Sequence, residues 1–350
     1  MAYDLPARNH KLIHAVQQRA QQLCPDALAL IGIYGSFATG GYSERSDLDL
    51  LILIHDERGY QLSCCFIQDD LGVGHDLYCT TWESLEDSAR QYSPAMPKLL
   101  DAQVVWSDGE ATMDRFRALQ AQAQAWMDAP YGAADLQQSE EMYNGLCTAY
   151  AEIMTAADRN WAGAAMLLYQ FENLHAQLHK TCYRRSTRYR LEELPPEVAA
   201  QVDALCRAES ADALKSAATT LVKTAQTLLA QRRESLRTSP APATAEALQG
   251  SYEECVSNWR GKAQTAAEIG DARLMLDALG NLEAMLLDIA GELDIPRYNV
   301  LGSYDPTDLT ASARHYDAIL ARYALEYERV GLPIRHYADI DEMIADYTKA

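Results

Sequence analysis

Residues 27–54 read ALALIGIYGSFATGGYSERSDLDLLILI, and this stretch decides the fold of the first part of the chain. Its two short apolar runs, 27–34 and 48–54, are typical of buried strands. Between them, Gly35-Ser36 lies where the first strand stops and a helix starts. The stretch therefore predicts a strand–helix–strand unit.

The Gly35-Ser36 dipeptide has two interpretations. A helix that begins here presents free backbone N–H groups and the positive end of its dipole, which suits a phosphate group. Gly35 lets the backbone approach a ligand closely, and the Ser36 hydroxyl can cap the helix or bind a phosphate oxygen. Taken alone, however, the dipeptide is better explained as a turn that only caps a helix.

Asp47 and Asp49 favour the functional interpretation. Residues i and i+2 of a strand point to the same face, so the two carboxylates project together. Two unpaired carboxylates held so near each other repel one another and lose hydration. A hard divalent cation removes both costs, because Mg²⁺ prefers carboxylate oxygens together with substrate phosphates. The alternative is that the two aspartates only mark the solvent-exposed start of a strand. Gly35-Ser36, with Ser36 eleven residues before Asp47, favours the interpretation as a metal site.

The rest of the chain separates into a mixed part and a helical part. Strand patterns at 75–80 and 103–107 and helical patterns at 9–22, 82–92 and 111–127 complete an α+β domain over residues 1–130. Helices then fill a bundle at 131–237. A Pro-, Ala-, Ser- and Thr-rich linker at 238–245 precedes a second helical bundle at 246–350. Similar residues recur between the bundles at offsets of 108 to 110, which indicates either duplication or chance.

Gly35-Ser36, ten intervening residues and Asp47-Leu48-Asp49 resemble the signature of the DNA polymerase β-like nucleotidyltransferase superfamily. The resemblance covers residues 27–107. The acidic helical half is most similar to the antibiotic nucleotidyltransferases, which act on aminoglycosides or lincosamides, and the minimal nucleotidyltransferases of toxin–antitoxin pairs share the signature. Thr39 departs from the pattern, because many small members have Arg there.

The resemblance implies a third carboxylate, for which Asp76 is favoured because it lies in the alternating run 75–80, whereas Asp69 and Asp70 look like a turn. It further implies that the three aspartates hold two Mg²⁺ ions and that ATP or another NTP is the co-substrate. The residues implied in nucleotide binding are Gly35, Ser36, Arg45 and Ser46. Asp76 would bridge a metal, act as general base, or both.

Signals from the helical half are weaker. Antibiotic nucleotidyltransferases often draw an acceptor-contacting carboxylate from their helical domain, and Glu172 is the candidate, with Glu140, Glu141 and Glu152 as rivals. The spacing His175-x-x-x-His179-x-x-Cys182 places three metal-ligating side chains on one helix face, although such a set is more often structural.

Composition limits the partners. The 350 residues include 30 Lys and Arg against 50 Asp and Glu, a net charge of -20. This argues against bulk nucleic acid and an anionic membrane surface, and it suits a small cationic acceptor. The eight Cys show no CxxC spacing, and the sequence has no apolar run of about 20 residues. The first residues, MAYDLPARNHKL, do not predict a signal peptide. We therefore expect a reduced, cytoplasmic protein.

The sequence thus predicts a Mg²⁺-dependent nucleotidyltransferase of the adenylyltransferase type. It would move AMP or another NMP to a hydroxyl of a small, aminoglycoside-like molecule. The first alternative is a protein adenylyltransferase of toxin–antitoxin or regulatory type. The second is a non-catalytic nucleotide-binding scaffold, against which the intact aspartates argue. A homodimer is left open, because active sites shared between subunits occur among similar enzymes.

Overall fold

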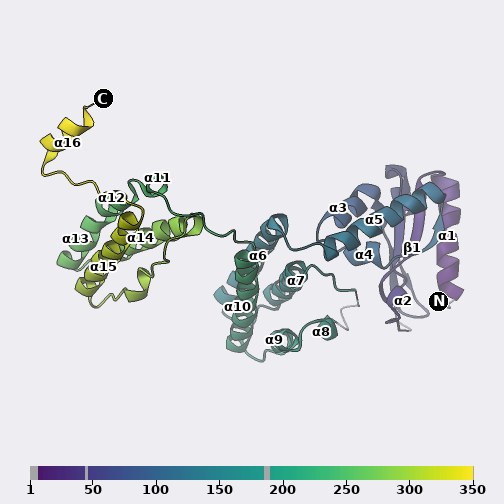
Figure 1. Ribbon diagram of the computed structural model, residues 1–350. Helices are drawn as coiled ribbons and strands as arrows, with labels where there is room; N and C mark the ends of the chain where they lie inside the picture. Colours follow the sequence, from purple (N-terminus) through teal and green to yellow (C-terminus); the bar gives the residue numbers. More distant parts are fainter. Residues whose placement is uncertain (1–6, 44–45, 185–189, 350) are drawn as a thin grey trace. The chain divides into compact units, whose positions relative to one another are not determined.

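The computed structural model describes residues 7–43, 46–184 and 190–349, and the chain divides into two compact units, residues 1–237 and 238–350 (Figure 1). The first unit contains a β-sheet and a helical bundle, and the second is built from helices. Among the described residues, no helix is both long and apolar enough to cross a membrane.

The main sheet has four strands in the order β5-β2-β1-β6. Strand β1 (Leu28–Ile33) pairs antiparallel with β2 (Leu50–Ile54) and with β6 (Gln103–Ser107). Strand β5 (Cys79–Thr81) lies parallel to β2. The sheet is therefore mixed, as the sequence predicts.

Helices cover both faces of this sheet, which explains why its central strands are apolar throughout. Leu50, Ile52 and Ile54 of β2 belong to a core formed with α1 (Ala7–Leu23). Leu51 and Leu53 face the opposite side. There they share a core with α3 (Trp82–Arg90), α4 (Met96–Leu100) and α5 (Glu110–Asp128). Figure 1 shows α1 on one side of β1 and these three helices on the other.

A separate antiparallel hairpin is formed by β3 (Cys64–Gln68) and β4 (Val73–Leu77). It follows the 3₁₀ helix η1 (Glu57–Leu62), and Gly72, at φ 60°, lies in its turn. The prediction of a single strand at 75–80 was wrong, because β4 ends at Leu77 and β5 begins at Cys79. Strand β3 was not predicted at all, since its residues are mostly exposed and do not alternate.

The bundle of the first unit consists of α6 (Ala133–Thr155), α7 (Trp161–Leu178), α8 (Arg190–Glu193), α9 (Pro196–Cys206) and α10 (Ala211–Ser235). Side-chain caps begin two of these helices. Asn160 accepts the Gly163 N–H at 2.9 Å, and Ser210 accepts the Ala213 N–H at 3.1 Å. The core between the helices is apolar, and Leu146, Phe171 and Leu221 are buried in it.

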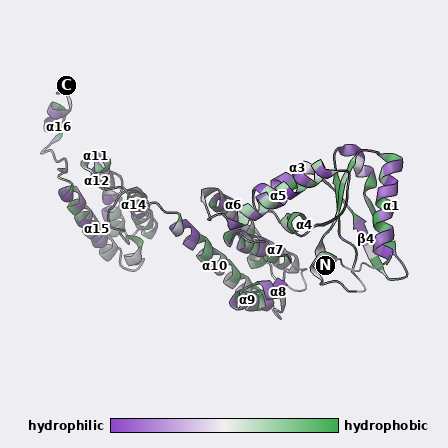
Figure 2. Cartoon of the chain, turned by 45° about the vertical axis from the view of Figure 1, so that its right-hand side comes forward, coloured by the Kyte–Doolittle hydropathy of each residue, from purple (hydrophilic) through white to green (hydrophobic). Residues whose placement is uncertain are grey.

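The second unit contains α11 (Ala245–Leu248), α12 (Ser251–Cys255), η3 (Val256–Arg260), α13 (Gly261–Ile269), α14 (Ala272–Glu292), η4 (Leu301–Ser303), α15 (Leu309–Arg329) and α16 (Ile340–Tyr347). Helices of both units mix hydrophilic and hydrophobic residues along their length (Figure 2). Segment η3 is a π turn between α12 and α13. Such a turn disrupts the regular pattern of helical hydrogen bonds. Directly before it, the Cys255 carbonyl accepts a hydrogen bond from the buried Tyr316 hydroxyl at 2.8 Å.

Candidate active site

The site is built where β1 ends and β2 begins. The N–H of Tyr34 donates to the carbonyl of Asp49 at 3.1 Å, which extends the pairing of the two strands beyond their regular part. Gly35 follows at φ 67°, a left-handed conformation that favours glycine. A Cβ at this position would overlap the Asp49 carboxylate. Gly35 is therefore required both by its backbone and by its contact with Asp49.

Helix α2 (Gly35–Thr39) is a single short turn that ends at Gly40. Its Ser36 N–H, expected to be free for a phosphate, acts on the Asp49 carboxylate and lowers the pKa of that group. The Thr39 hydroxyl donates back to the Gly35 carbonyl at 2.9 Å, so this departure from the family pattern makes a local hydrogen bond. The start of α2 is thus tied to Asp49.

Asp47 and Asp49 lie on either side of Leu48, which is buried in the core shared with α1. Because side chains alternate along an extended chain, both carboxylates share the direction of Leu51, toward the α3–α5 side. Burial, together with the charges of Asp47 and Asp76, raises the pKa of Asp49 to about 6, although the Ser36 N–H and Lys98 act in the opposite direction. The structure therefore brings the three predicted aspartates within electrostatic range of one another.

The Tyr34 phenol lies beside the same cluster. Burial, followed by the charges of Asp49, Asp76 and Asp47, raises the pKa of this phenol to about 12. The phenol is thus neutral at ordinary pH and its O–H remains available as a donor. Asp47 and Asp76 also line one cavity of about 460 Å³, together with residues of the β3–β4 hairpin, Cys65, Phe66, Ile67, Gly74 and His75.

The donor chemistry of these aspartates fits a divalent cation. Three carboxylates supply the hard oxygen ligands that Mg²⁺ prefers, and their mutual repulsion favours a cation among them. In the described part of the chain, no three His, Cys, Asp or Glu side chains form a ready-made metal cluster. The fit therefore rests on the type and proximity of the carboxylates.

Lys98 of α4 is a site residue that the sequence analysis missed. Its ammonium donates to the Thr80 hydroxyl and lies 5.5 Å from the centroid of the Tyr34 ring. Burial lowers the pKa of Lys98, whereas the Cys79 thiol and the charges of Asp49 and Asp76 raise it. No motif could have identified a single lysine in a five-residue helix, because its place depends on tertiary packing.

The remaining predicted nucleotide-binding residues precede Asp47. Arg45 lies outside the described residues. Ser46 closes a turn, because its side-chain oxygen accepts the Ser43 N–H at 2.8 Å, and its carbonyl accepts a hydrogen bond from Arg8 at 3.1 Å. These contacts fix the approach of the chain to Asp47.

Glu172 lies in a second cavity, of about 390 Å³, between residues 92–97 and the helical bundle. Its carboxylate is 3.4 Å from Nε of Arg190, whose guanidinium lies 4.5 Å from the centroid of the Tyr183 ring. Burial raises the pKa of Glu172, and Arg190 opposes this. Tyr92, Tyr169, Asn173 and Tyr183 also line the cavity, whereas the rivals Glu140, Glu141 and Glu152 do not.

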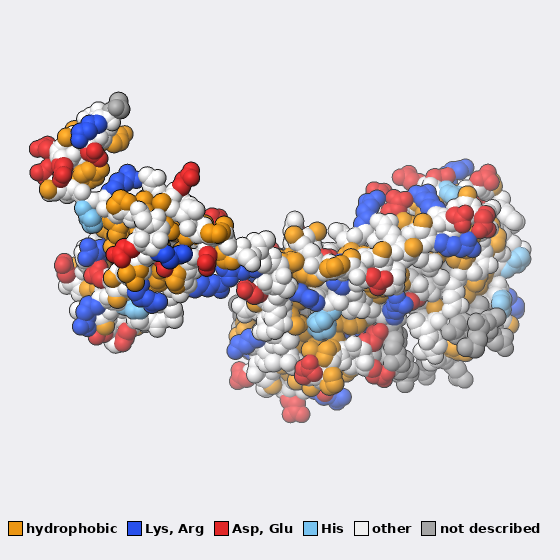
Figure 3. Space-filling model, viewed as in Figure 1, with side chains coloured by type: hydrophobic (Ala, Val, Ile, Leu, Met, Phe, Trp, Pro, Cys, Tyr) orange, Lys and Arg blue, Asp and Glu red, His pale blue; other side chains and the backbone are white. Residues whose placement is uncertain are grey.

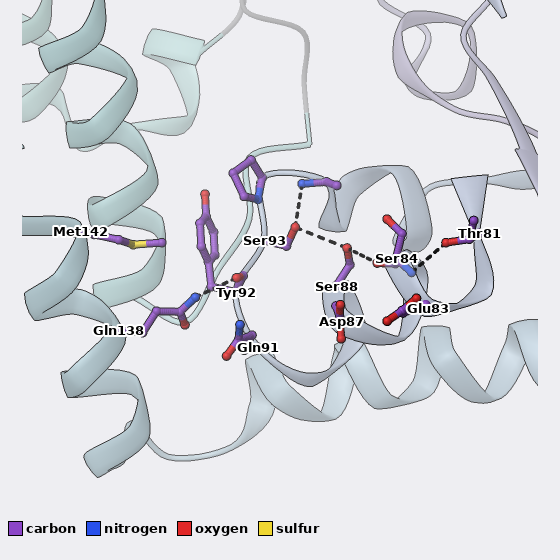
Figure 4. A pocket seen from close by; sticks show the side chains of 12 residues that line it. Thr81, Glu83, Ser84, Asp87, Ser88, Gln91, Tyr92, Ser93, Gln138 and Met142 are labelled. Carbon is purple, nitrogen blue, oxygen red and sulfur yellow. Dashed lines mark hydrogen bonds between the residues drawn. The ribbon is translucent and has the colours of Figure 1, made fainter. Parts of the chain in front are cut away.

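A further cavity, of about 500 Å³, contains none of the predicted site residues. Figure 4 shows it between the α3 region, with Glu83 and Asp87, and α6, from which Gln138 and Met142 point toward it. The Gln138 amide donates to the Tyr92 carbonyl at 3.0 Å. The polar side chains that line this cavity are largely engaged in such local hydrogen bonds, and we assign the cavity no ligand.

The set His175, His179 and Cys182 is not a metal site. His175 accepts or donates a 2.6 Å hydrogen bond with the Tyr183 hydroxyl, and its ring stacks on His179 at a centroid distance of 4.2 Å. Cys182 is directed elsewhere, toward the sulfur of Met127 at 3.9 Å. Burial, with the charge of His179, lowers the pKa of His175 to about 4. The three residues are structural.

Residues 11–94 match the family model of the nucleotidyltransferase domain. The chain therefore carries a nucleotidyltransferase domain in its first unit, consistent with the superfamily that the signature resembles. The matched segment includes Gly35, Asp47, Asp49 and Asp76 but ends before Lys98 and the helical bundle. No curated protein matches the chain.

Proposed function

We propose that the protein transfers a nucleoside monophosphate, AMP from ATP in the first instance, to a hydroxyl of a small molecule. The observation that supports this most directly is that Asp47 and Asp76 line one cavity and that their charges act on Asp49, with all three residues inside the matched segment. The acceptor oxygen would attack the α-phosphorus, the bond to pyrophosphate would break, and the hydroxyl proton would pass to a carboxylate. The exposed Asp76, on the wall of the cavity, is suited to take that proton.

The aspartates would hold two Mg²⁺ ions, which would neutralise the triphosphate and activate the acceptor hydroxyl when bound. Asp47 and Asp49 would bind one ion, and all three aspartates would bind the other. Gly35 keeps space for the Asp49 carboxylate. Most of the catalysis would be positioning and charge neutralisation, because these residues are fixed before the reactants arrive.

The cavity beside Glu172 is our candidate for the acceptor. Its lining combines the rings of Tyr92, Tyr169 and Tyr183 with the Glu172 carboxylate, groups that suit an amine-bearing ring. Arg190 neutralises part of the negative charge of the Glu172 carboxylate. An acceptor with a small positive charge therefore fits this cavity better than a highly charged one. Acidic side chains are spread over the face seen in Figure 3 and are not gathered at one place.

Two variants test the proposal. Asp47→Ala and Asp49→Ala should abolish release of pyrophosphate from ATP and Mg²⁺ in the presence of an acceptor, while Asp69→Ala, in the β3–β4 turn, retains it. Folding is checked by circular dichroism. Normal turnover by a folded Asp47→Ala protein would contradict the proposal.

A protein acceptor is the alternative that the same residues support. Labelling a cell lysate with α-labelled ATP separates the two, since a protein acceptor yields a labelled band that is lost in Asp47→Ala. A nucleotide-binding scaffold would show no metal-dependent ATP binding at all. A cytoplasmic location and a homodimer stay predictions.

A further inference from the structure

Lys98 of α4 and the aspartates Asp47 and Asp49 lie on the same side of the main sheet, the side that α3, α4 and α5 cover. Asp47 and Asp49 continue the face of β2 that carries Leu51 and Leu53, and α4 packs against this face through Met96 and Leu99. The Lys98 ammonium is held there by Thr80 of β5, the strand next to β2, and by the face of the Tyr34 ring.

The Lys98 ammonium and the carboxylate cluster would each destabilise the folded protein if the other were absent. A half-buried ammonium loses hydration, and three neighbouring carboxylates both lose hydration and repel one another. The positive charge of Lys98 favours the charged form of Asp49, and Asp49 and Asp76 in turn favour the charged form of Lys98. Both statements concern the described residues.

A divalent cation at the aspartates would meet the positive charge of Lys98. Since both neutralise the same carboxylates, each weakens the binding of the other through electrostatic repulsion. A bound triphosphate, which carries several negative charges, removes this conflict because it can balance both cations. Lys98 therefore couples the binding of metal to the binding of nucleotide.

We propose that Lys98 is the internal counter-cation of Asp49 and Asp76, and that it weakens metal binding by the nucleotide-free protein so that the metal binds together with the nucleotide. This inference rests on the proposed function, since it assumes the metal and nucleotide sites described above. Lys98 is then a positioning residue, because it acts through the aspartates.

The test measures binding of Mn²⁺, a spectroscopic substitute for Mg²⁺, by electron paramagnetic resonance with and without a non-hydrolysable ATP analogue. Without nucleotide, Lys98→Met should bind Mn²⁺ about tenfold more tightly or better than the wild-type protein. The analogue should improve Mn²⁺ binding by the wild-type protein much more than by Lys98→Met. Lys98→Arg, which keeps the charge, should resemble the wild type.

Lys223→Met is the matched control, because Lys223 lies far along the chain on α10 and the charge change is the same. Should Lys98→Met fail to fold, Lys98→Gln takes its place. Equal or weaker Mn²⁺ binding by the uncharged variant overturns the inference. Failure of the proposed function has a different result, in which neither the wild type nor Lys98→Met binds Mn²⁺ even with the analogue. Asp49→Asn should leave the signal of free Mn²⁺ undiminished both with and without the analogue.

Discussion

Gly35 lies directly against the carboxylate of Asp49, and the space between them has no room for a methyl group. The turn that begins α2 and Asp49, the metal-binding candidate directly before β2, are therefore fitted to each other. The Ser36 N–H also favours the charged form of this carboxylate, which adds a second link between the two segments.

Gly35→Ala should remove activity and reduce stability. The change places a Cβ on the Asp49 carboxylate and imposes a residue with a side chain at φ 67°, which together cost about 2 kcal/mol or more. Pyrophosphate release should fall by at least about 100-fold, because a displacement of about 1 Å at a reacting centre has that effect. Gly40→Ala is the control. Gly40 has φ 78° but open space around it, so that variant should lose about 1 kcal/mol in urea denaturation and keep its activity. Equal activity in both variants would show that the contact with Asp49 is unimportant.

Glu172→Gln should raise the KM for the acceptor about tenfold, with the KM for ATP and kcat little changed. The variant keeps the shape of the side chain but loses the charge that would strengthen a hydrogen bond to an amine. Steady-state kinetics with an amine-bearing acceptor measures this. Glu152→Gln, exposed on α6, should behave as the wild type. A fall in kcat alone would place Glu172 outside acceptor binding.

His175 should make the first unit less stable in acid. Burial lowers the pKa of the folded His175 to about 4 from the ordinary 6.5, so the unfolded chain binds more protons between these values. The stability that the folded protein gains from a neutral His175 is complete above pH 6.5 and is lost as the pH falls toward 4. The free energy of unfolding, measured by urea denaturation, should therefore fall by about 2–3 kcal/mol more than in His175→Gln. His10→Gln, at an exposed position of α1, should follow the wild type. Parallel pH curves for all three proteins would contradict this account.

Tyr316→Phe should destabilise the second unit by about 1 kcal/mol, because the Cys255 carbonyl beside the π turn loses its buried donor. Tyr298 provides the comparison, since its buried hydroxyl has no hydrogen-bond partner among the described residues. Tyr298→Phe should therefore leave stability unchanged or raise it. Thermal denaturation followed by calorimetry compares the two, and pyrophosphate release should be normal in both. Equal destabilisation by both variants would assign the effect to packing.

The sequence could predict the two strands at the centre of the candidate site because their signals are local. The apolar runs of β1 and β2 and the i, i+2 relation of Asp47 and Asp49 depend only on neighbouring residues. The hairpin strand β3 was missed because Cys64–Gln68 is exposed and lacks alternation. Lys98 and Tyr34 could not be found, since their contact arises when α4 packs on the sheet. Glu172 was named without a spacing rule, and its neighbour Arg190 emerged only from the fold.

The boundary between residues 237 and 238 has a practical consequence. Every residue with a proposed chemical role, from Gly35 to Arg190, belongs to the first unit. Helices of the second unit can therefore be shortened, exchanged or fused to other proteins without touching a reacting group. Changes confined to residues 238–350 therefore leave in place every residue to which a chemical role is proposed, so the two units can be altered separately by mutagenesis.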